Sequence, residues 1–105
     1  LAALRTVSRE FDRELAASPH GRLIAVTSSA VAHPRAGYAS YAALKAAAEA
    51  WVLAVADGYA RTGTGAAANL IVATTLADYE AELGDRVVEI LEAAPTLVNG
   101  QRIPL

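Results

Sequence analysis

Apolar residues recur along the chain with two different periods, which predict an alternation of helices and strands. In residues 1–17 they are spaced by three and four positions, the pattern of a helix with one apolar face. Residues 23–27 and 67–73 are short apolar runs that turn residues bound and that lack polar alternation. Such runs are typical of strands covered on both faces, as in a parallel sheet.

The longest helix is predicted from Tyr38 or Ala39 to about Tyr59. Within residues 42–56 only Lys45 and Glu49 are charged. A helix that is apolar on nearly all sides must be buried on all sides. One of its faces can cover the sheet, but the other requires another subunit or another part of the protein. We therefore expect self-association through this helix, as a homodimer or homotetramer.

The C-terminal third predicts one more helix and one more strand. Residues 76–84 are polar and acidic and are interpreted as a connection, and residues 85–94 have the periodicity of a helix. Residues 101–105 are expected to form a last short strand, which Pro104 places at an edge or an end of the sheet. The order helix, strand, helix, strand, helix, strand predicts an α/β fold with a parallel sheet, in one partial domain over residues 1–105.

The composition excludes several classes of function. A net charge of −2 gives no electrostatic basis for binding nucleic acid. Cysteine is absent, and His20 and His33 have no partner at ligand spacing, so we expect no metal site. No run approaches the roughly 20 apolar residues of a membrane-spanning helix, and the amphipathic start is not a signal peptide. We expect a cytoplasmic protein without membrane contact, and a chain that starts inside a longer protein.

A tyrosine and the only lysine of the chain share one face of the long helix. Tyr41 and Lys45 are four residues apart, and every other basic residue is arginine. A free tyrosine has a pKa of about 10, and a nearby ammonium favours the phenolate, so such a pair can exchange a proton with an alcohol oxygen. Ser28 follows a buried strand, where ligands of open α/β sheets bind. Alternatively, Lys45 forms an ordinary surface ion pair with Glu49.

The same residues resemble the active-site segment of the short-chain dehydrogenase/reductase family. The family's Y-x-x-x-K pair is present as Y-A-A-L-K from Tyr41 to Lys45. Its strand of the form G-R-I-V-x-x-S-S matches G-R-L-I-A-V-T-S, which places the family's serine at Ser28, with Ser29 as the fallback. The strand that contains Asn69 and the later N-G-Q turn also fit the C-terminal half of the family.

The resemblance implies an oxidoreductase that transfers hydride between NAD or NADP and a small carbonyl or alcohol substrate. Tyr41 would be the general acid/base, and Lys45 would stabilise its phenolate and hold the nicotinamide ribose. Ser28 would orient the substrate oxygen, and Thr74 or Thr75 would contact the nicotinamide amide. The implied fold is part of a Rossmann-like, doubly wound parallel sheet.

The chain departs from the family pattern in three places. No strand–G-x-x-x-G-x-G–helix occurs, the Pro-Gly after the second strand is replaced, and residues 76–84 are too few for the usual substrate lid. We therefore expect a fragment that lacks the N-terminal dinucleotide-binding half of the enzyme. The alternative is a non-catalytic scaffold or dimerisation module of the same family.

Overall fold

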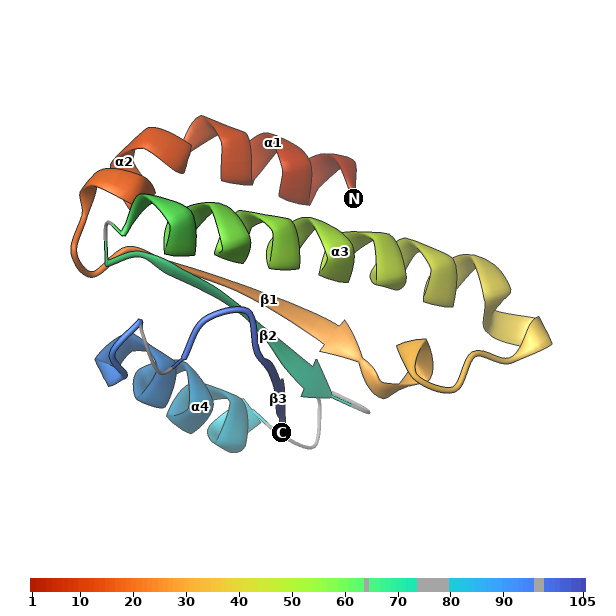
Figure 1. The fold of residues 1–105 in the computed structure, drawn as a ribbon. Coiled ribbons are helices and arrows are strands. Elements are labelled where there is room, and N and C mark those ends of the chain that lie inside the picture. Colours follow the sequence, from red (N-terminus) through yellow and green to blue (C-terminus); the bar gives the residue numbers. More distant parts are fainter. Residues whose placement is uncertain (64, 74–79, 96–97) are drawn as a thin grey trace.

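The computed structural model describes residues 1–63, 65–73, 80–95 and 98–105. Helices and strands alternate along the chain after an initial helix pair, as the sequence predicts (Figure 1). In chain order, the elements are α1 (Ala2–Glu10), α2 (Asp12–Ala17), β1 (Arg22–Ser28), α3 (Ala39–Thr62), β2 (Ala67–Ala73), α4 (Glu80–Glu92) and β3 (Arg102–Pro104), with 3-10 turns at Ser29–Val31 and Ala36–Tyr38.

The described strands form one parallel sheet in the order β1-β2-β3. β1 pairs with β2 along its whole length, from Arg22 opposite Ala67 to Ser28 opposite Ala73. α1, α2 and α3 lie on one side of this sheet and α4 lies on the other (Figure 1). The prediction of an α/β fold with a parallel sheet is therefore confirmed.

The core is centred on β2, because this strand has a neighbour on each edge and helices on each face. Leu70 and Ile71 of β2 are almost inaccessible to solvent, and so is Val52 of α3. Val52 belongs to one buried cluster with Ala56 and with Leu70. β1 is only half-buried over most of its length, so the prediction of a strand covered on both faces holds better for β2.

The first helix and the start of the last helix differ from what the sequence predicts. The first helix is interrupted at Phe11, which separates α1 from α2. α4 begins at Glu80, so the prediction of a polar connection is wrong for residues 80–84, and residues 76–79 lie outside the described residues. The helix includes Gly84, because a single glycine inside a helix costs only about 1 kcal/mol and good helix formers surround it.

Two asparagines fasten the turn before β3 to the rest of the fold. Asn69 is fully buried; its Oδ1 accepts from the backbone N–H of Gln101 at 3.1 Å and its Nδ2 donates to Val98 O at 3.2 Å. Asn99 accepts from the N–H of Ala68 and donates to the backbone of α3. These bonds fix where the chain enters β3, and therefore where Arg102 lies.

Arg22 fastens α4 to the sheet at the amino ends of β1 and β2. Its guanidinium donates to the carbonyl of Ile90 in the last turn of α4 and to that of Ala93 just after the helix, where the helix dipole favours a positive charge. It also donates to two carbonyls beside the amino ends of β1 and β2. The four acceptors belong to Gly21, Gly65, Ile90 and Ala93.

The segment Ala36–Thr62, which contains α3, is long and apolar enough to cross a membrane by length and composition alone. The expectation that no run approaches this limit is therefore wrong. In the structure α3 lies along β1 and β2, with the carboxylate of Glu49 buried beneath it. Contact with the sheet accounts for the apolar residues on the face of α3 that packs against β1 and β2.

Candidate active site

Tyr41 and Lys45 lie together at the start of α3, as their spacing predicts. The Nζ atom of Lys45 is 5.9 Å from the centroid of the Tyr41 ring, within the range of a cation–π contact. The lysine stem leans toward the preceding turn, which is the usual direction of long side chains on a helix. Tyr41 is 46% exposed and Lys45 is half-buried, so the pair is accessible to a ligand.

Both side chains line a cavity of about 380 Å³ between α1, β1 and α3. Lys45 is the only charged side chain among its lining residues, and the surroundings are otherwise apolar apart from the phenol. An apolar cleft with a few polar groups is the usual form of a small-molecule site. The lining residues are Leu1, Ala3, Leu4, Ala25, Val26, Tyr41, Leu44, Lys45 and Ala48.

Ser28 is the last residue of β1, as the sequence predicts, and its side chain is buried. Its hydroxyl accepts from the N–H of Ala30 at 3.1 Å and caps the following 3-10 turn. Within the part of the chain that the structure describes, no hydrogen bond joins Ser28 to Tyr41 or Lys45. Ser29, the fallback for the active-site serine, is half-buried and begins the same turn.

Glu49 does not pair with Lys45, so the alternative interpretation of Lys45 as an ordinary ion-pair partner is wrong. Its side chain faces the sheet and is only 5% exposed. Oε2 accepts from the hydroxyl of Thr27 at 2.7 Å, and Oε1 pairs with the guanidinium of Arg102. A buried carboxylate requires such partners, and Glu49 finds them on β1 and β3.

The sequence reasoning missed Thr27 and Arg102 as neighbours of this site. The only signal was a lone glutamate in a helix that was predicted to be buried, since a buried carboxylate must have a cation nearby. Thr74 and Thr75, the candidates for the nicotinamide amide, lie outside the described residues. No group of three or more His, Asp or Glu residues that could hold a metal ion occurs in the described ranges.

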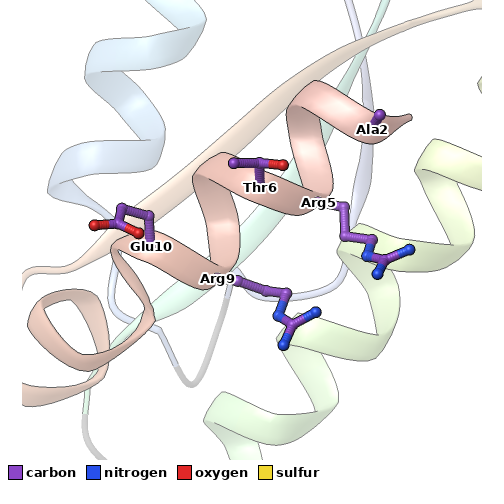
Figure 2. A pocket seen from close by; sticks show the side chains of 5 residues that line it. All are labelled: Ala2, Arg5, Thr6, Arg9 and Glu10. Carbon is purple, nitrogen blue, oxygen red and sulfur yellow. The ribbon is translucent and has the colours of Figure 1, made fainter.

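A second hollow lies along α1 (Figure 2). Arg5 and Arg9 extend to the same side of the helix, while Thr6 and Glu10 lie elsewhere along it (Figure 2). All residues that line this hollow belong to one helix, which is the charged face that the sequence predicts for residues 1–17. It contributes nothing to the cavity that holds Tyr41 and Lys45.

Comparisons of the chain with protein-family models, curated proteins and solved structures gave no match. The interpretation of the site therefore depends on its residues and their geometry. Those residues form a phenol–ammonium pair in an apolar cavity beside a buried strand, an arrangement suited to proton transfer at a ligand oxygen.

Proposed function

We propose that this chain carries the proton-transfer half of an NAD(P)-dependent oxidoreductase of the short-chain dehydrogenase/reductase class. The observation that supports it is the Lys45 ammonium, 5.9 Å from the Tyr41 ring in an apolar cavity, with the nearest carboxylate on α3 bound elsewhere. A phenol held beside an ammonium in an apolar cavity is suited to exchange a proton with an alcohol oxygen. The parallel sheet with helices on both faces is compatible with the C-terminal half of a Rossmann-like fold.

In this proposal each group acts on one substrate oxygen. Tyr41 donates its proton to that oxygen during reduction and accepts it during oxidation, with the Lys45 ammonium beside its ring. The Ser28 hydroxyl accepts from Ala30 and still has its own proton to donate to the substrate. Whether the serine is Ser28 or Ser29 is decided by which substitution weakens catalysis.

The residues of the cavity fit one end of the cofactor. A phenol and an ammonium can both bind ribose hydroxyls, so Tyr41 and Lys45 would hold the nicotinamide ribose of NAD or NADP. The cofactor, when bound, supplies the hydride. The chain has no glycine-rich strand-to-helix turn for the pyrophosphate, so we place that part of the site in a segment outside residues 1–105.

The test uses the longer enzyme that we propose. Tyr41→Phe keeps the ring and removes the hydroxyl, and we expect it to lower kcat/KM for carbonyl reduction by about 10²–10⁴-fold. Tyr38→Phe removes a hydroxyl that is more exposed and three residues away, and we expect activity close to that of the wild type. Retained activity in Tyr41→Phe would overturn the proposal.

The second candidate, a non-catalytic dimerisation module, is favoured by the outer face of α3. Leu53 is 39% exposed there, and Ala50 and Ala54 beside it are also exposed. We expect a homodimer or homotetramer by light scattering, and Leu53→Glu should dissociate it. Leu91→Glu, on the exposed side of α4, is the matched control. A scaffold also predicts that Tyr41→Phe has no effect, which separates it from the enzyme.

A further inference from the structure

Glu49 is an alternative partner to Tyr41 for the Lys45 ammonium, and the fold keeps its carboxylate away from Lys45. The two residues are four apart on α3, the spacing at which lysine and glutamate normally pair on a helix. The structure instead places the Lys45 ammonium near the ring of Tyr41. Both carboxylate oxygens of Glu49 are bound by other elements, one by the hydroxyl of Thr27 and one by the guanidinium of Arg102.

Arg102 is the group that neutralises the buried carboxylate. The hydroxyl of Thr27 satisfies a hydrogen bond but carries no charge. Arg102 is 53 residues from Glu49 in the sequence and reaches it because β3 pairs with β2. Its guanidinium therefore supplies the positive charge beside the buried carboxylate. Without Arg102, Glu49 would lack this partner, and the cation nearest to it along α3 is Lys45.

We propose that Arg102 is a positioning residue for the proton-transfer pair. By binding Glu49 it leaves the Lys45 ammonium to Tyr41, and it does so from a strand that does not line the cavity. Among the described residues, α1 and β1 contribute only apolar side chains to the cavity beside Lys45, so the carboxylate nearest to Lys45 along α3 is that of Glu49, which Arg102 binds. The role in catalysis rests on the proposed function, but the placement of Lys45 does not.

The single lysine makes this placement measurable without substrate or cofactor. In the 105-residue chain, selective ¹³C labelling of lysine gives one side-chain signal by NMR, and its cross-relaxation with the Tyr41 ring reports the contact. We expect Arg102→Gln to reduce this cross-relaxation by about half or more, because the freed Glu49 competes for the ammonium. The double variant Arg102→Gln, Glu49→Gln should restore the wild-type value.

Two further variants keep the test decisive if Arg102→Gln does not fold. Glu49→Gln removes the competing charge and should leave the Lys45 contact with Tyr41 unchanged. Arg61→Gln, which breaks an exposed pair with Asp57 on the same helix, is the matched control and should also leave it unchanged. The proposal is overturned if the contact between Lys45 and the Tyr41 ring persists in folded Arg102→Gln. It is also overturned if Glu49→Gln alters that contact. An inactive longer enzyme with the expected NMR results would reject only the proposed function.

Discussion

The indole Nε1 of Trp51 donates a hydrogen bond of 2.7 Å to the hydroxyl of Ser8 and so joins the middle of α3 to α1. Ser8 is only 4% exposed, and its hydroxyl donates a hydrogen bond of 3.1 Å to the carbonyl of Arg5. Both polar groups are therefore satisfied where the two helices meet. The position of α1 over α3, beside the cavity, depends in part on this bond.

Removing the acceptor should weaken the contact between these helices. Ser8→Ala leaves the indole N–H without its partner, and we expect the free energy of unfolding to fall by about 1–3 kcal/mol. Urea unfolding followed by the fluorescence of Trp51, the only tryptophan, measures the change. Ser40→Ala, at an exposed position, is the control and should change stability by less than about 0.5 kcal/mol. Equal stabilities of the two variants would show that the bond contributes little.

A side chain at Gly21 has no room. A Cβ atom there would lie 2.3 Å from the carbonyl oxygen of Leu15, which is backbone and cannot turn away. We expect Gly21→Ala to destabilise the chain by about 1–3 kcal/mol or more, as overpacking does. Gly37→Ala meets nothing within 4 Å and should be close to neutral. Thermal unfolding of both variants tests this, and matching midpoints would contradict the expected clash.

Loss of the Arg22 guanidinium should release α4 before it unfolds the sheet. Arg22→Ala removes four hydrogen bonds to backbone carbonyls, one in the last turn of α4 and one just after that helix. We expect amide hydrogen exchange in α4 to accelerate at least about tenfold, since hydrogen bonds from charged groups contribute about 1.5–3 kcal/mol each. Arg86→Ala removes only an exposed pair with Glu89 and is the control. If amide hydrogen exchange accelerated equally in α4 and in β2, the helix and the sheet would open together, and the expectation would be wrong.

Tyr59 should make the fold sensitive to alkaline pH. Its burial, and then the negative charge of Asp12, raise the pKa of its phenol above the ordinary value of 10.0. Above that value the unfolded chain loses the proton first, so the native state binds more protons and stability falls as pH rises. Tyr59→Phe should flatten this fall, measured as the free energy of unfolding between pH 9 and about 11. An unchanged slope would show that other groups determine it.

Local patterns predicted the elements that carry the candidate site. The strand at residues 67–73 has the predicted bounds, and the long helix begins at Ala39, one of the two starts given. It ends at Thr62, three residues after Tyr59, because the next residue, Gly63, adopts a left-handed conformation with φ of 63°. A short apolar run between turn residues is too short for a helix of ordinary length, so the two strands at residues 23–27 and 67–73 were predictable.

Relationships between distant residues were not predictable in the same way. The apolar stripe of the first helix is only partly covered: Leu4 and Leu15 pack against the core, whereas Val7 and Phe11 are about half exposed. The pairing of Glu49 with Arg102 depends on the order of the strands, which no local pattern of the sequence contains. The i,i+4 rule therefore gave the right partner for Tyr41 and the wrong one for Glu49.

The guanidinium of Arg22 has a consequence for engineering this chain. It holds α4 at the amino ends of the strands, whereas the phenol and ammonium lie on the first turns of α3, after the carboxyl end of β1. Libraries that randomise the exposed face of α4 can therefore be screened for solubility with the proton-transfer pair held constant, provided that Arg22 is kept. The two ends of the sheet become separate modules for directed evolution.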